Sequence, residues 1–172
     1  MGFRRTHPPE KWGHYVTSTH TILIVFTRVI IKEILAKGSD FPWIKPRACP
    51  SPSCGGTRLW GHGFVTAFFD GFTAPIPLKR YRCPDCGCVI RMRPEGYPSR
   101  FQAPIQEIRH NLFQRLRTGK WPRGPSRPRL RHWLRALKRR ALAILGHGWP
   151  GGLMAAFDHL LSRGHNPVSR VM

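Results

Sequence analysis

Apolar positions follow strand spacing in the first half of the chain. Residues 21–26 are β-branched and apolar, which predicts a buried strand. Residues 28–37 predict a short helix that Gly38 ends. Three more strands are expected at residues 58–65, 76–82 and 89–93. Gly61 and Gly63 interrupt the first of these three and indicate a bulge or a close backbone approach.

The last of these strands has two chemically different faces. Side chains alternate along a strand, so Ile90 and Met92 share one face, while Arg91 and Arg93 share the other. The alternation therefore predicts a ribbon with arginines on its solvent side.

After Pro98 the pattern becomes helical. Helices are expected at residues 105–118, 126–145 and 152–163, with Ser126 as an N-cap and Gly146 as a stop. The apolar stripe of the first is Ile105, Ile108, Leu112, Phe113 and Leu116. The second has Leu130, Trp133, Leu134, Leu137, Ala141 and Leu145, and the third has Leu153, Phe157, Leu160 and Leu161.

These elements predict an α+β protein, in which a small metal-bound β-ribbon precedes a basic helical region. The chain of 172 residues is long enough for one ordinary domain or two small ones. The expected division is an N-terminal arm with strand and short helix (1–47), the ribbon (48–96), the helical region (102–164) and a frayed tail (165–172).

Four cysteines lie in two short bends, Cys49-Pro-Ser-Pro-Ser-Cys54 and Cys83-Pro-Asp-Cys86-Gly. Zinc prefers four such soft ligands at tetrahedral corners, and a bend that holds two thiolates supplies half of the site. We therefore expect structural Zn²⁺ at Cys49, Cys54, Cys83 and Cys86. Unmetallated thiols and redox-active pairs are the open alternatives. A catalytic zinc is disfavoured because a fourth thiolate fills the position that water would need.

Two further residues lie near this motif. Cys88 is expected to be a spectator that offers its backbone amide to a metal-bound sulfur while its side chain points away, although an exchange with Cys86 stays open. His62 is expected to be a surface or hydrogen-bonded residue. The five cysteines are an odd number and include two close pairs, and no recognisable secretory signal precedes them; this combination favours metal binding in a reducing cytoplasm over disulfides.

The charge is strongly positive, with 29 Lys and Arg against 8 Asp and Glu, or +21. This excess indicates a polyanionic partner, most commonly nucleic acid. The predicted 126–145 helix concentrates it, without a single acid: Arg127, Arg129, Arg131, Arg135, Lys138, Arg139 and Arg140. A solvated charged face is the plain alternative, but such faces usually interleave Glu with Lys. The expected nucleic-acid contacts are Arg91, Arg93, Arg127, Arg131, Arg135, Lys138 and Arg139.

Other functions find less support in the sequence. The eight acids form no paired-carboxylate motif, and no phosphate-binding Gly loop or nucleophile elbow is present, so an enzyme is not expected. The most apolar stretch is broken by charges and is too short for a membrane span. The 105–118 and 126–145 helices could form a helix-turn-helix-like pair, although the connection is longer than in the tight motif; a plain helical bundle stays open.

The two bends and the sequence around them, from Cys49 to Gly63 and from Ile76 to Gly87, resemble the zinc ribbon of bacterial insertion-sequence transposases. They are also similar to small bacterial proteins that carry that ribbon without a nuclease. The resemblance implies the same four cysteine ligands and a helix-turn-helix segment after the ribbon. This chain departs from the family in its wider first bend, in Cys88 and in lacking an acidic catalytic core.

These observations and the resemblance predict a zinc-ribbon protein that binds DNA, most simply duplex DNA, and that is derived from or associated with a transposase but has no catalytic core. Its expected place is the bacterial cytoplasm, at the nucleoid. An RNA- or ribosome-associated ribbon is the first alternative, with Trp60, Phe64, Phe68 and Phe69 as candidate stacking residues. A protein–protein adaptor that docks its basic helix on an acidic partner is the second.

Overall fold

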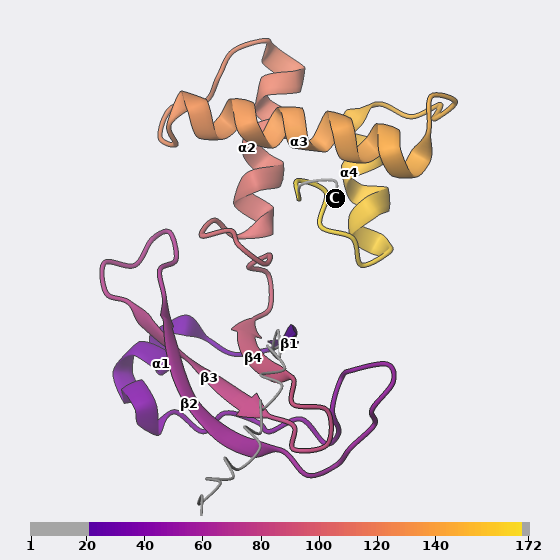
Figure 1. Cartoon of the computed structure of the whole chain (residues 1–172). Coiled ribbons are helices and arrows are strands. Elements are labelled where there is room, and N and C mark those ends of the chain that lie inside the picture. The colour runs from indigo at the N-terminus through magenta and orange to yellow at the C-terminus, as the bar shows by residue number, and fades with distance from the viewer. Residues whose placement is uncertain (1–20, 170–172) are drawn as a thin grey trace, which may run out of the picture.

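The computed structural model describes residues 21–169, which build a mixed sheet and a group of three helices, each around its own apolar core. Figure 1 shows the sheet and the helices as two parts joined by one connecting segment. We call residues 21–96 the sheet unit and residues 101–169 the helical unit. The α+β class expected from the sequence is confirmed.

The sheet has four strands in the order β1-β4-β3-β2. Their bounds are Ile22–Thr27 (β1), Trp60–Ala67 (β2), Ile76–Arg82 (β3) and Val89–Pro94 (β4). β2, β3 and β4 are antiparallel neighbours, whereas β1 runs parallel to β4 along its whole length. The expected boundary at residue 47 therefore does not separate β1 from the ribbon. The sequence pattern identified β1 as a strand but could not reveal a partner so far along the chain.

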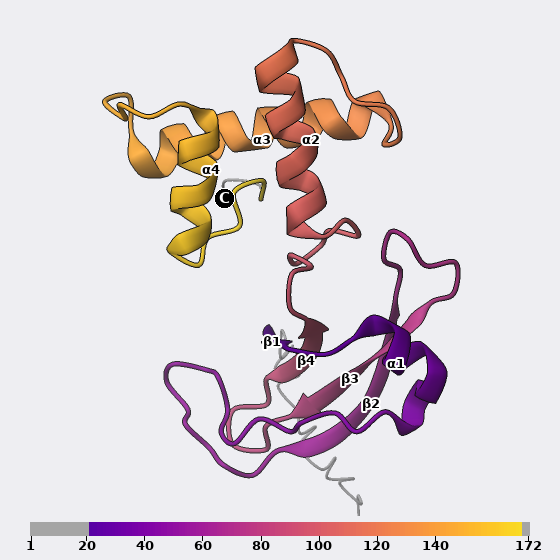
Figure 2. The ribbon, with the colours of Figure 1, turned by 180° about the vertical axis from the view of Figure 1, so that it is seen from behind.

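Local chemistry explains two features of the sheet. The register between β2 and β3 shifts between Gly61 and Phe64, and Gly63 has φ +68°, which confirms the expected bulge. The short helix α1 (Ile31–Lys37) covers one face of the sheet and ends at Gly38, where φ is +56° (Figure 2). Its buried Ile31 and Ile34 join the core formed by the apolar faces of β3 and β4.

Arg93 corrects the expectation of an arginine-lined solvent face. Its side chain is only 6% exposed, and it donates hydrogen bonds from Nε to the Tyr97 carbonyl (2.8 Å) and from a terminal nitrogen to the Phe101 carbonyl (2.5 Å). The guanidinium also lies 4.9 Å from the centre of the Phe69 ring. Burial, followed by the nearby charge of Arg91, lowers the pKa of Arg93 to about 10. The alternation is correct, but the segment after β4 folds back over this side.

The helical unit consists of α2 (Ile105–Thr118), α3 (Arg127–Leu145) and α4 (Leu153–Ser162). α2 and α4 lie on the same side of α3, behind it in Figure 1 and in front of it in Figure 2. Their shared core is centred on Trp133, with leucines from all three helices. Gly146 ends α3 with φ +77°, as expected.

Two expectations for this unit are wrong. Phe113 and Leu116 are exposed, because α2 extends past α3 (Figure 1) and its buried residues end at Leu112. The tail is not frayed up to residue 169: Val168 is fully buried in the helical core, and its amide donates to Asn166 Oδ1 (3.2 Å). The tail beyond Ser169 and the N-terminal arm up to residue 20 lie outside the described residues.

The two units touch through a short series of polar contacts. Arg129 of α3 pairs with Asp70 in the β2–β3 loop, and the Asp70 amide donates to the Gln102 carbonyl (3.1 Å). The Ile105 amide, at the start of α2, donates to the Gly96 carbonyl (2.7 Å). In the described part of the chain, no helix is long and apolar enough to cross a membrane.

Candidate metal centre

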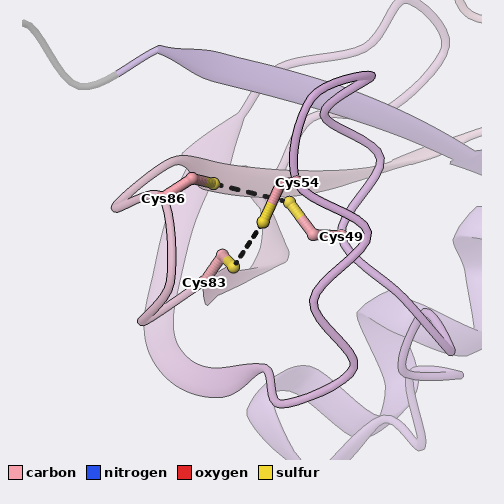
Figure 3. Close-up of side chains that lie close together, drawn as sticks. All are labelled: Cys49, Cys54, Cys83 and Cys86. Atoms are coloured by element: carbon pink, nitrogen blue, oxygen red, sulfur yellow. Dashed lines mark hydrogen bonds between the residues drawn. The ribbon is translucent and has the colours of Figure 1, made fainter.

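Two loops of the sheet unit bring four cysteines together. β3 runs directly into Cys83, the loop to β4 adds Cys86, and the loop that precedes β2 supplies Cys49 and Cys54. Figure 3 shows the four side chains converging from these two loops. All four sulfurs lie within 4.8 Å of one another, and among residues 21–169 no other group of His, Cys, Asp or Glu has such spacing.

The spacing of the sulfurs fits a metal ion with four thiolate ligands. The Sγ–Sγ distances are 3.6 Å between Cys49 and Cys86 and 3.6 Å between Cys54 and Cys83. Sulfurs bound to Zn²⁺ at 2.3 Å in a regular tetrahedron would be about 3.8 Å apart. These two distances are close to the tetrahedral value, and the remaining ones are within 4.8 Å, so the cluster is compatible with a closed four-thiolate site.

Backbone hydrogen bonds hold both loops in shape. The Cys49 amide donates to the Gly56 carbonyl (2.7 Å). In the second loop the Gly87 amide donates to the Cys83 carbonyl (2.9 Å), and the Cys83 amide to the Cys88 carbonyl (3.0 Å). Gly87 has φ +73°, a left-handed conformation that glycine adopts without the steric cost of a Cβ.

The loops also contact each other beside the sulfurs. A Cβ built on Gly56 would lie 2.1 Å from Asp85 Oδ2, so a glycine leaves room for the opposite loop at this point. Asp85 in turn forms an ion pair with Arg58 (3.6 Å). Sequence spacing identified the four cysteines, but it gave no sign of this close approach.

Without a cation the four sulfurs are not all thiolates, because the pKa values of two of the thiols are strongly raised. The pKa of the Cys86 thiol falls to about 6, first because the Cys88 amide donates to it and then through the neighbouring thiols. Burial, helped by the same neighbours, raises the pKa of Cys49 to about 12. At Cys54 the Gly56 amide lowers the pKa most, but burial and the other thiols outweigh it and raise the value to about 12. A divalent cation would displace these protons and make all four groups ligands.

Cys88 is closer to the cluster than expected. Its amide does donate to the Cys86 sulfur, as expected for a spectator at this offset. Its side chain, however, is buried, and its Sγ lies 3.4 Å from the Cys49 sulfur instead of pointing away. Cys88 is not one of the four mutually close sulfurs, and neither is the half-buried His62.

No protein-family model, curated protein or solved structure matches this chain. The resemblance to transposase zinc ribbons therefore rests on the cysteine motif and the residues around it, and it stays a prediction.

The residues expected to contact nucleic acid differ in their position and in their exposure. Five of them are exposed on α3, namely Arg127, Arg131, Arg135, Lys138 and Arg139. We call these five residues the cationic face. Arg91 lies apart from them on β4 and is half-buried, opposite Arg80 of the neighbouring strand. Arg93, being buried, is not available to an external ligand.

The left-handed glycine of the second loop allows a test of the metal centre. Gly87→Ala should destabilise the metal-loaded sheet unit by about 1–2 kcal/mol, because an L-residue is strained at φ +73°. Chemical denaturation followed by circular dichroism would measure the change. Gly148→Ala is the matched control: it has open space around its Cβ and no left-handed φ, so a change below about 0.5 kcal/mol is expected. Equal losses in both variants would contradict the strain argument.

Proposed function

We propose that this chain is a zinc-stabilised protein that binds duplex DNA, of the type that accompanies or derives from transposases, and that it has no catalytic role. The observation that carries the proposal is the cationic face of α3. The metal would stabilise the sheet unit, and the helical unit would supply most of the affinity for DNA.

The donor set supports zinc as the metal. Four thiolates suit soft and borderline cations, and tetrahedral S₄ sites are typical of zinc and iron–sulfur proteins. With all four positions taken by protein ligands, no position remains for a reactive water. Such a site stabilises a fold and performs no hydrolysis.

The cationic face supports the DNA assignment through its charge and its exposure. α3 contains no acid, so its exposed Arg131, Arg135 and Arg139 repel one another unless an anion neutralises them. α2 and α4 lie on one side of α3 (Figures 1 and 2), and the five residues of the cationic face are exposed. The helix has 19 residues and is about 28 Å long, and a helix of this width fits the major groove of B-form DNA.

Neutralising the cationic face tests the proposal. Arg131→Gln, Arg135→Gln and Arg139→Gln, combined in one variant, should weaken duplex binding about a hundredfold or more at low salt, because three phosphate contacts are lost. The slope of log K against log[salt] should become shallower by about 0.9 for each contact. Fluorescence anisotropy across a salt series measures both quantities.

The matched control removes three positive charges from the sheet unit. Lys32→Gln and Lys37→Gln change exposed residues of α1, Arg47→Gln changes an exposed residue in the loop before Cys49, and together they lower the net charge equally. This control should retain most of the affinity and the original slope. If both triple variants lose affinity equally, overall charge explains the binding and the cationic face has no special role. A wild-type affinity that is independent of salt would favour a protein–protein adaptor.

One observation favours RNA as the second candidate. Of the four aromatic residues considered for base stacking, Trp60 at the start of β2 is 60% exposed and Phe68 just beyond its end is 55% exposed. Phe69 is buried, and the ring of Phe64 is covered by the Lys79 ammonium 4.4 Å away. Competition among duplex DNA, single strands and structured RNA distinguishes the candidates. A preference for RNA that Trp60→Ala abolishes would replace the DNA assignment.

A further inference from the structure

A pocket of about 850 Å³ lies beside the cationic face, on a different side of α3. The segment that precedes α2 forms one wall, the flank of α3 forms the second, and the C-terminal turn forms the third. Pockets of this size hold small-molecule ligands such as nucleotides. We call it the linker pocket; its polar and charged lining includes Arg100, Arg129, His132, Arg140, Asn166 and Ser169.

The charge of the linker pocket is positive and largely uncompensated. Three guanidinium groups line it, and no acid does. Only Arg129 has a carboxylate partner, since it pairs with Asp70 outside the lining and also lies 4.9 Å from the centre of the Trp133 ring. Arg140 is half-buried and has no carboxylate partner among the described residues. An anion in the pocket would compensate this charge.

The walls of the linker pocket are held by contacts that involve no residue of the cationic face. Buried Arg93 donates to the Phe101 carbonyl, and the Asp70 amide donates to the Gln102 carbonyl, so both hold the linker wall. The opposite wall is the turn at Asn166, which the fully buried Val168 anchors in the helical core. A rigid pocket of this kind loses little entropy when it binds a ligand.

Backbone strain is concentrated at the same place. Arg100 has φ +67° and is the one residue other than glycine with a positive φ in the part of the chain the structure describes. Such a conformation is uncommon for a residue other than glycine, and residues held in unfavourable conformations cluster at functional sites. Here it directs a third guanidinium-bearing residue to the pocket lining.

We propose that the linker pocket binds a phosphate monoester of a nucleotide, either free or at the end of a nucleic-acid strand. Guanidinium groups bind phosphate oxygens in a bidentate manner, and the serine and asparagine side chains add neutral donors for the remaining lone pairs. The volume of the pocket exceeds that of inorganic phosphate and leaves room for a sugar and a base beside Phe101 and His132. This site does not depend on duplex binding by the cationic face.

Calorimetric titration of the whole, metal-loaded protein at fixed salt tests the site. Adenosine monophosphate should give saturable binding, whereas adenosine should not. Arg140→Gln should lower the affinity for the monophosphate about tenfold or more, because a charge-assisted contact is lost. Arg139→Gln is the matched control, an adjacent residue with the same charge change that faces solvent, and should leave this affinity within about twofold while weakening duplex binding.

A second variant covers the case in which Arg140→Gln fails to fold. Arg100→Gly removes a guanidinium and relieves the strain at φ +67°, so it should lower the affinity for the monophosphate while the unfolding midpoint is unchanged or higher. Oligonucleotides with a 5′-phosphate or a 5′-hydroxyl separate the two sources of the phosphate: a preference for the former indicates a strand end, and no preference indicates a free nucleotide.

Two results would overturn the proposal. One is equal loss of monophosphate affinity in Arg139→Gln and Arg140→Gln, which would indicate general attraction to a basic helix. The other is equal binding of adenosine and its monophosphate, or no saturable binding of either. If the wild-type protein binds the monophosphate but does not bind duplex DNA, the proposed function is contradicted and the linker pocket is unaffected, since the two are measured with different ligands.

Discussion

Removing the metal is expected to unfold the sheet unit and leave the helical unit folded. A structural zinc site contributes about 10–16 kcal/mol of apparent binding free energy at neutral pH. A sheet of four short strands with one covering helix has a small core, and the buried Cys49 and Cys83 are part of it. The helical unit has a separate core centred on Trp133, to which no cysteine contributes.

Amide NMR spectra of the whole protein, recorded while a chelator is added under reducing conditions, would measure this effect. Signals of residues 21–96 should lose their dispersion, and those of the three helices should keep it. Cys83→Ser should have the same effect without chelator, because it leaves an incomplete site. Acid should act in the same direction as chelator, since protons compete with the metal for the thiolates and metal binding weakens as the pH falls.

Cys88→Ser is the matched control for these changes. Cys88 is buried beside the cluster but is not one of its four mutually close sulfurs, so this variant should retain one metal ion per chain by elemental analysis. Loss of the metal in Cys88→Ser, with retention in Cys86→Ser, would show that Cys88 is the fourth ligand. A chelated protein whose sheet signals stay dispersed would contradict a structural role for the metal.

Features that depend on local sequence could be predicted. The spacing of the cysteines identified a cluster whose sulfurs do lie together, because short loops determine their own geometry. Strand β3 was predicted with the same bounds that the structure shows. The glycines at positions 38 and 146 end helices as expected. The exposed cations of α3 follow directly from helical periodicity.

Features that depend on distant contacts could not be predicted. The parallel pairing of β1 with β4 joins residues that are 67 positions apart in the chain (22 with 89), and nothing within either strand indicates it. The alternation of side chains predicted the side of β4 on which Arg93 lies. It could not predict that the segment after β4 covers this side chain. The linker pocket combines residues from a loop, a helix and the C-terminal turn, so no local pattern marks it.

Replacing Arg93 is expected to destabilise the protein more than replacing any exposed arginine. Arg93→Met keeps the length of the side chain but leaves the carbonyls of Tyr97 and Phe101 without their donor. Each buried acceptor that loses its partner costs about 1–3 kcal/mol, so the two carbonyls together cost about 2–6 kcal/mol. Relief from burying a charge, which the lowered pKa of Arg93 reflects, offsets part of this cost. The expected net loss is about 2–4 kcal/mol.

Arg91→Met provides the control, because it makes the same change two residues away on the same strand. Arg91 is half-buried and lies directly opposite Arg80, and like charges in this position repel. Its replacement should therefore leave the free energy of unfolding unchanged or slightly raised, as measured by urea denaturation. Because Arg93 holds the segment between the units, Arg93→Met should also speed hydrogen exchange at the Gln102–Asp70 contact, and Arg91→Met should not. Similar stabilities for the two variants would mean that the covering segment is held mainly by its apolar contacts, and that the two carbonyls find other donors.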